Sequence, residues 1–262
     1  MNDWARSRKR IILAIVLLAV AILVGVPFFL LFYQVPTCSD GVMNGDESGV
    51  DCGGSCARLC NAESLPIISK GDPRVLTIAP NTFEVVSLVE NPNQSAEIRQ
   101  AKYTFKIYDA AGVIPVKVVE GSTFVPRGAS FAIFEGPFTL EAGVTPARAT
   151  LEWEVDALSW EKSDAAEPSV ELAGIALSEA STTPRLSAVV ENLSLGQVSN
   201  LDFVALISDS EGNLFAASKT FVDNIAPGES APIVFIWPRP FVKEATQIEI
   251  VKRIFPDRSF IK

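Results

Sequence analysis

The sequence has 262 residues, of which 48% are hydrophobic, and a formal net charge of −9 at pH 7. This length corresponds to one or two domains with additional segments, and the acidic balance gives no electrostatic support for nucleic-acid binding. The chain contains no histidine, which excludes Ser-His-Asp and Cys-His catalysis and the commonest zinc and iron ligand sets.

The chain begins with an apolar segment that is long enough to cross a bilayer. Residues 11–33 contain no charged side chain, and a helix of about 20 apolar residues spans a bilayer core. The preceding tail, residues 1–10, carries four basic side chains and one acidic one. By the positive-inside rule this tail stays in the cytoplasm. The sequence therefore predicts a single-pass protein of the cytoplasmic membrane, with its N-terminus inside and its C-terminal domains outside.

A cleaved signal peptide is the alternative interpretation of the same segment. The apolar region of a signal peptide is usually about 7–15 residues long and ends in small residues. Here the apolar run is longer, it ends in aromatic residues, and no A-x-A pattern precedes the first cysteine. The length of the run favours an uncleaved anchor.

All four cysteines, Cys38, Cys52, Cys56 and Cys60, lie in one acidic module, residues 34–62. An even number of cysteines just outside a membrane favours two disulfides, and the sequence leaves all three pairings open. A zinc site made of four thiolates is the competing interpretation. It is disfavoured because the C-x3-C-x3-C spacing differs from the usual C-x2-C pairs.

Oxygen-bearing side chains are concentrated between the first two cysteines, at Asp40, Asn44, Asp46, Glu47 and Asp51. Calcium takes six to eight oxygen ligands from a tightly turning loop, so these residues are candidate calcium ligands. The segment is not an EF-hand, because the D-x-[DN]-x-[DN]-G frame is absent. The alternative is a disulfide-stapled turn whose acidic residues face solvent, since any tight loop uses Asp, Asn and Gly.

Residues 38–56 read C-S-D-G-V-M-N-G-D-E-S-G-V-D-C-G-G-S-C. This segment resembles a short cysteine-rich module of the form C-x-D-G-x-x-N-G-x-E-x-x-x-D-C-G-G-x-C, which is found in exported microbial surface proteins. The resemblance covers only this window of the chain. It implies export in a bacterium or archaeon rather than a particular activity.

After a linker at residues 63–72, short β-type runs separated by turn residues continue along the chain. Five sequence blocks recur in the same order at an offset of about one hundred residues, which is the mark of an internal duplication. Residues 85–91, 103–112, 124–128, 134–138 and 149–153 correspond to residues 186–192, 203–212, 224–228, 237–241 and 246–250.

The duplication predicts a mainly β fold with two tandem Ig-like β-sandwiches, each with about seven strands. The sandwiches are expected at residues 73–160 and 169–262, joined by a linker at residues 161–168. The recurring V-x-N, D-x-x-G and P-G elements resemble the adhesion-type Ig-like domains of bacterial and archaeal surface proteins. Neither copy contains a cysteine, so the inter-sheet disulfide of antibody domains is absent.

Few other residues in the repeats are candidates for function. N-x-S sequons at Asn93 and Asn192 are predicted to be exposed glycosylation sites, if the source organism uses such sequons. Trp153, Trp160 and Trp237 are expected to pack in the core or on a sheet face, and a sugar-stacking platform is the alternative. The sequence has no phosphate loop and no activated nucleophile. We therefore expect no enzymatic activity, no catalytic residue and no cofactor other than calcium.

Together these features predict a membrane-anchored, outward-facing, non-enzymatic protein of the cell envelope. Sandwich domains in series mostly act as spacers and binding surfaces, so we expect adhesion or a structural role, with a protein or an envelope polymer as the partner. Two alternatives stay open. One is an exported carbohydrate-binding or envelope-processing protein, and the other is a component of a secretion or pilus apparatus.

Overall fold

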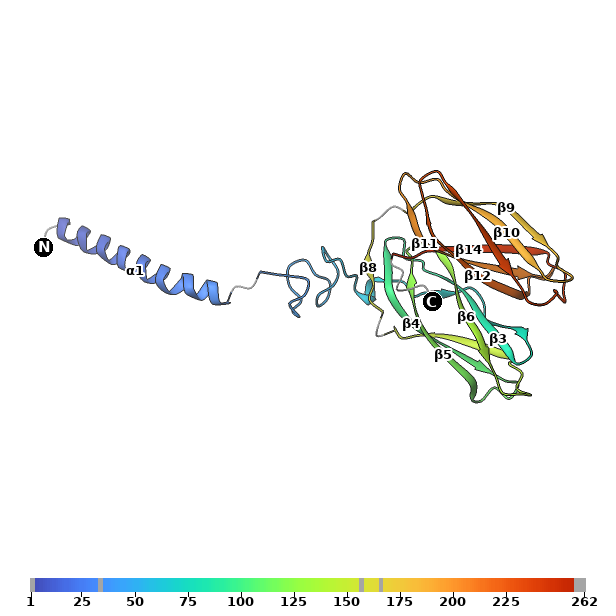
Figure 1. Ribbon diagram of the computed structural model, residues 1–262. Coiled ribbons are helices and arrows are strands. Elements are labelled where there is room, and N and C mark those ends of the chain that lie inside the picture. Colours follow the sequence, from blue (N-terminus) through green and yellow to red (C-terminus); the bar gives the residue numbers. More distant parts are fainter. Residues whose placement is uncertain (1–2, 33–34, 156–157, 165–166, 257–262) are drawn as a thin grey trace. The chain divides into compact units, whose positions relative to one another are not determined.

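Figure 1 shows the computed structural model of the chain, which forms two compact units, Met1–Ser55 and Cys56–Lys262. The structure describes residues 3–32, 35–155, 158–164 and 167–256. The first unit contains a long helix and the acidic loop, and the second unit contains the β-strands.

The first unit begins with α1 (Asp3–Phe32), a continuous helix of 30 residues. Its segment Ser7–Leu30 has a mean hydropathy of 3.1 and is exposed along its length. A helix of this length and composition can cross a membrane, although an N-terminal signal sequence has the same properties. Pro27 lies inside the helix, which membrane helices tolerate. The structure thus confirms the N-terminal apolar helix, and its orientation stays a prediction.

The first β-sandwich in the second unit is built from six long antiparallel strands in two sheets. One sheet consists of β2 (Arg74–Ala79), β3 (Thr82–Glu90) and β6 (Ser130–Thr139), with β3 in the centre. The other sheet consists of β4 (Ala96–Tyr108), β5 (Pro115–Val125) and β7 (Arg148–Trp153), with β4 in the centre.

The second β-sandwich repeats this arrangement. One sheet consists of β9 (Val170–Ser178), β10 (Arg185–Asn192) and β13 (Ser230–Ile236), with β10 in the centre. The other sheet consists of β11 (Val198–Ser208), β12 (Leu214–Ile225) and β14 (Gln247–Ile254), with β11 in the centre. Both sandwiches therefore place their first, second and fifth long strands in one sheet and the others in the second sheet.

The mainly β fold and the two sandwich-like units agree with the sequence-based prediction, but two details differ. Each sandwich has six long strands among the described residues, where about seven were expected. In addition, Phe134 pairs with Val86 and Val234 pairs with Ser187. Because Val86 and Ser187 hold the same place in the repeat, the structural equivalent of Phe134 is Val234, and the alignment of residues 134–138 with 237–241 was wrong.

Each sandwich encloses its own apolar core. Side chains of a strand alternate between the two faces of its sheet, and every second residue of the central strands points inward. The first core includes Val85, Phe105, Ile107, Phe131 and Ile133. The second core includes Leu186, Phe203, Ile207, Ile233 and Phe235. Burying an aliphatic or aromatic side chain of this kind contributes about 1.5–3 kcal/mol, so these cores account for much of the stability of each sandwich.

A third apolar cluster lies between the two sandwiches. The first sandwich contributes Leu76, Val86 and Ala132, and the second contributes Val204, Leu206 and Ala217. These residues alternate with those of the two cores, so the β2–β3–β6 and β12–β11–β14 sheets are covered on both faces. The second unit is therefore a four-layer β structure, in which the two sandwiches share a buried interface.

The two segments that were predicted as linkers contain short strands. Residues 63–72 include β1 (Ile68–Ser69), which pairs with β3, and residues 161–168 include β8 (Glu161–Lys162), which pairs with β4. The Leu65 N–H also donates to Asn93 Oδ1 at 2.8 Å. These segments are attached to the first sandwich because their backbone groups complete hydrogen bonds at the ends of its sheets.

A buried asparagine occupies the same position in both copies. Asn91 and Asn192 are both 0% exposed; Asn91 directly follows the central strand β3, and Asn192 is the last residue of the central strand β10. The Asn91 side-chain amide donates to the carbonyls of Ala96 and Pro126, each at 2.8 Å. In the second copy the acceptors of the Asn192 amide include the carbonyl of Ile225 at 2.9 Å. The asparagine of the V-x-N element thus holds two loops together by hydrogen bonds at one end of each sandwich.

Replacing Asn192 with alanine is expected to lower the free energy of unfolding by about 2–3 kcal/mol, because it leaves buried carbonyls without donors. Asn91→Ala is expected to have an effect of similar size. Urea unfolding followed by tryptophan fluorescence measures both. Asn224→Ala, on the exposed side of β12, is the control and should change stability by less than about 0.5 kcal/mol. Equal effects at Asn192 and Asn224 would contradict this role.

Candidate functional site

The acidic loop of the first unit uses its carboxylates to hold its own backbone. Asp51 accepts hydrogen bonds from the Gly41 N–H through both carboxylate oxygens, at 3.0 and 3.1 Å. Asp40 accepts from the Val42 N–H at 2.9 Å and from the Asn44 side-chain amide at 2.9 Å. The hydrogen bond from Asn44, followed by those from the backbone, lowers the pKa of Asp40.

The remaining two candidate ligands also bind loop groups. Asp46 accepts from the Ser55 N–H at 3.0 Å and from the Ser55 hydroxyl at 2.8 Å, and Glu47 accepts from the Asn44 N–H at 3.2 Å. Gly54 has φ +53°, and a Cβ there would lie 2.0 Å from the Asp46 carbonyl oxygen. The close approach explains why the loop needs glycine at this position.

The alternative interpretation was a stapled turn whose acidic residues face solvent. In the structure these residues instead accept hydrogen bonds from the backbone of the loop, and Asp40, Glu47 and Asp51 are half-buried. A calcium ion would need oxygen atoms that converge on one point. Among the described residues, no three carboxylates bring their oxygens within 4.8 Å of one another. Asn44 Oδ1 is buried and has no hydrogen-bond partner among these residues, so this oxygen is available to coordinate an ion. Calcium binding by this loop stays a prediction.

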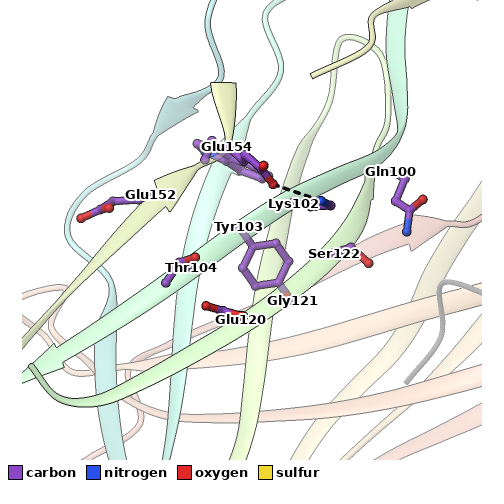
Figure 2. Close-up of a pocket in the computed structure, with 10 residues that line it drawn as sticks. Gln100, Lys102, Tyr103, Thr104, Glu120, Gly121, Ser122, Glu152 and Glu154 are labelled. Atoms are coloured by element: carbon purple, nitrogen blue, oxygen red, sulfur yellow. Dashed lines mark ion pairs between the residues drawn. The ribbon is translucent and has the colours of Figure 1, made fainter. Parts of the chain in front are cut away.

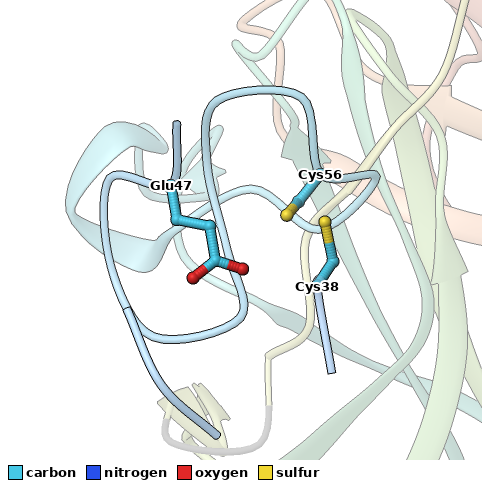
Figure 3. Close-up of side chains that lie close together, drawn as sticks. All are labelled: Cys38, Glu47 and Cys56. Carbon is cyan, nitrogen blue, oxygen red and sulfur yellow. The ribbon is translucent and has the colours of Figure 1, made fainter. Parts of the chain in front are cut away.

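The four cysteines are all disulfide-bonded, as predicted. Figure 3 shows Cys38, Glu47 and Cys56. Among the described residues, this is the one set of three side chains whose potential metal-ligating atoms lie close together. Zinc binds the thiolate form of cysteine, and neither sulfur is available in that form. The disulfides therefore rule out the competing zinc interpretation of the cysteine cluster.

The outer face of the β5–β4–β7 sheet carries a polar hollow of about 660 Å³ (Figure 2). Side chains from all three strands line it: Gln100, Lys102, Thr104, Glu120, Ser122, Glu152 and Glu154, with Tyr103, Gly121 and Trp153 beneath or beside them. Lys102 forms an ion pair with Glu154 at 3.3 Å, and Lys106 beside the hollow pairs with Glu152 at 2.7 Å. This pairing raises the pKa of Lys106.

The lining of this hollow is polar and charged. Its hydroxyl, amide and charged groups can donate and accept hydrogen bonds over an open sheet face. Tyr103 supplies no reactive group, because its ring is 4% exposed and its hydroxyl donates to Glu135 at 2.6 Å. Burial, with that hydrogen bond, raises the pKa of Tyr103 far above its usual value.

The tryptophans give little support to a sugar-stacking platform. Trp160 is 2% exposed and Trp237 is 5% exposed, and the Trp237 indole N–H donates to the Ala217 carbonyl at 2.7 Å. Both are core residues, which was the default expectation. Trp153 is half-buried, with its ring edge-on to Tyr103 at a centroid distance of 6.0 Å. It borders the polar hollow and is the one of these three rings that a sugar could reach.

The two sequons lie at buried asparagines. Asn192 is 0% exposed and Asn93 is 9% exposed. The Asn93 amide donates to the Leu65 carbonyl at 2.8 Å, and the Asn192 amide donates to the loop carbonyls described above. A glycan needs an accessible side-chain nitrogen, so this burial argues against glycosylation at either site in the folded protein.

The interface between the sandwiches contains an ion pair that sequence analysis missed. Arg253 on β14 is 9% exposed, and its Nη2 lies 3.3 Å from Asp202 Oδ2 on β11. Its Nη1 reaches across to the first sandwich and donates to Thr123 Oγ1 at 2.8 Å. The guanidinium also lies over the Phe131 and Phe255 rings, at 5.1 and 4.4 Å. Burial lowers the pKa of Arg253, and the Asp202 charge opposes that shift.

A second buried charge-bearing group lies at the same interface. Glu84 on β3 is 7% exposed and accepts a hydrogen bond from the Ala217 backbone on β12. Its Oε1 has no hydrogen-bond partner among the described residues. Burial raises the pKa of Glu84 to about 8, so the carboxyl is mostly protonated at neutral pH. Nothing in the local sequence of β3 signals this environment, because the covering strand comes from the other sandwich.

Comparisons with known proteins add little to this description. No protein-family profile matches the chain, and no curated protein matches it in sequence. Among solved structures, it is similar to red sea bream transglutaminase, with 11% identity and a TM-score of 0.21. The match covers 70% of this chain and 30% of the transglutaminase chain. A similarity at this level carries no functional argument.

The fold and these sites define the class of protein. The chain is a mainly β protein with an N-terminal apolar helix, a disulfide-containing acidic module and two sandwich-like units joined in one four-layer body.

Proposed function

We propose that the chain is a membrane-anchored, outward-facing and non-enzymatic protein of the cell envelope, with two Ig-like sandwiches that act as one rigid binding and structural block. The apolar helix α1 supports the anchor. The two disulfides support an oxidising location outside the cytoplasm. The shared strand arrangement of the two sandwiches supports the Ig-like assignment.

The interface between the sandwiches is the observation that carries the proposal. Domains in series usually move relative to each other unless their interface is large and apolar. Here the two inner sheets bury an apolar cluster, and Arg253 bonds to both sandwiches. A rigid block of this kind holds the outer sheet faces at fixed positions. The polar hollow on the β5–β4–β7 face is the proposed contact surface for an envelope polymer or protein.

Protease protection on intact cells tests the topology on which this function depends. We expect an epitope tag after Lys262 to be removed by protease added outside the cells, or outside spheroplasts if a wall blocks access. A tag before Met1 should stay protected until the membrane is opened, because the basic tail is cytoplasmic. The full-length product should carry both tags, since the anchor is not cleaved. Loss of the N-terminal tag during export would show a signal peptide and refute the anchor.

A further inference from the structure

The outer face of the β9–β10–β13 sheet is solvent-accessible, but its two middle rows contain no charged residue. The strand register places Ala176, Ser187 and Val234 in one outward row, and Ala173, Val189 and Pro232 in the next. None of the six is charged, and apolar exposure continues at the edges, with Ile175 45% and Ile236 55% exposed. The middle of this face therefore consists of two neighbouring rows of uncharged residues, each of which runs across all three strands.

The outer face of the β5–β4–β7 sheet provides a comparison within the same molecule. Its outward positions include the exposed Lys102, Glu120, Glu152 and Glu154 and the half-buried Lys106. Such an alternation of apolar inward and charged outward residues is typical of a sheet that faces water. The β9–β10–β13 face departs from this pattern, which is expected of a surface that is covered by a partner.

The internal duplication shows what can cover such a face. In the first sandwich the equivalents of Ser187, Val189, Pro232 and Val234 are Val86, Leu88, Ala132 and Phe134, as the strand pairings establish. That face is buried against the β12–β11–β14 sheet. The same face of the repeated unit is therefore already used once in this chain for packing against another sheet.

We propose that the β9–β10–β13 face binds the same face of a second copy of this chain, around a two-fold axis that sets the two β10 strands antiparallel. One end of the face carries the cross-strand pair Glu171 and Glu191, and the other end carries Arg185. An antiparallel two-fold arrangement places Arg185 of each copy over the glutamates of the other. The uncharged rows then meet in the middle, as a self-complementary interface requires.

The size of the face sets the expected strength of the dimer. Three strands of about seven residues give a flat area of roughly 14 by 24 Å per copy, from the usual strand spacing and rise. Such an area, about 340 Å² per copy, is well below the roughly 800 Å² per partner of stable protein interfaces and corresponds to a weak, transient contact. The dimer is therefore reversible, and covalent trapping is the appropriate measurement.

The test uses the purified full-length chain in detergent and a short bismaleimide crosslinker. All four native cysteines are in disulfides, so a single introduced cysteine is the reactive site. Val189→Cys, at the centre of the face, is expected to give a covalent dimer in at least several-fold higher yield than Thr104→Cys. Thr104 is the matched control, because it lies on the central strand β4 of the charged outer face.

A second variant shows whether crosslinking at Val189→Cys depends on this face or results from misfolding of the cysteine variant. Adding Val234→Glu to the Val189→Cys chain should reduce the dimer yield to that of the Thr104→Cys control, because it places a carboxylate in the middle of the interface. Circular dichroism confirms that each variant is folded. Equal yields from Val189→Cys and Thr104→Cys, or a yield that Val234→Glu leaves unchanged, would overturn the proposal.

Discussion

Replacing Arg253 with methionine is expected to lower the free energy of unfolding of the second unit by about 3–5 kcal/mol, the usual cost of removing one partner of a buried ion pair. Asp202 is 5% exposed and would lose the cation that pairs with it. Thr123 would lose the guanidinium donor that joins the two sandwiches. Urea unfolding of the full chain in detergent, followed by tryptophan fluorescence, measures the loss.

Two further variants show whether the loss comes from the unpaired charge. The double variant Asp202→Leu with Arg253→Met should recover most of the stability, because an apolar pair can replace a buried ion pair of similar volume. Arg239→Met changes an exposed arginine and should cost less than about 0.5 kcal/mol. If the double variant is as unstable as Arg253→Met, the cost comes from lost packing rather than from the charge of Asp202.

The sandwich fold could be predicted from the sequence because its signals are local. Strand β4 alternates between inward residues such as Phe105 and outward ones such as Lys106, and an Asp-x-x-Gly turn follows it. An Asp-x-x-Gly turn also follows β11, at residues 209–212, so the duplication was visible without a structure. The disulfides could also be predicted from the sequence, because an even number of cysteines clustered just after an apolar N-terminal segment favours disulfides.

The four-layer arrangement leaves only a partial signal in the sequence. Residues 203–207 of β11 form an uninterrupted apolar run, and such a run indicates a strand that is buried on both faces. Val85 and Val86 on β3 give the same signal. What covers the second face depends on contacts between residues more than one hundred positions apart, such as Arg253 with Thr123, and no local pattern specifies that choice.

The candidate sites show the limit of reading function from residue types. The carboxylates at Asp46 and Asp51 were correctly placed in a tight loop, but acidic side chains that bind calcium and those that cap backbone amides have the same sequence signature. A three-residue sequon likewise contains no information about burial. The valine-rich strand before Asn192 was the available clue, because an asparagine that ends such a strand can turn inward and bind the next loop.

Replacing Glu84 with glutamine is expected to remove most of the pH dependence of stability between about pH 4.5 and 8. Burial raises the pKa of Glu84 to about 8 in the folded protein, whereas the unfolded chain titrates near the ordinary value. The folded state therefore binds the proton more tightly. Its stability is highest below the unfolded pKa and falls as the pH rises through the folded pKa, by about 3–5 kcal/mol in total.

Urea unfolding of both chains at pH 5 and pH 9 measures this effect. At pH 5 the carboxyl is protonated and hydrogen-bonds like an amide, so Glu84→Gln should match the parent chain closely. At pH 9 the variant should be the more stable by several kcal/mol, because it carries no buried charge against β12. Glu120→Gln, on the exposed outer face of β5, controls for the loss of one negative charge and should leave the pH dependence unchanged. A parent chain and Glu84→Gln variant that lose the same stability between pH 5 and pH 9 would show that the interface opens to water around Glu84.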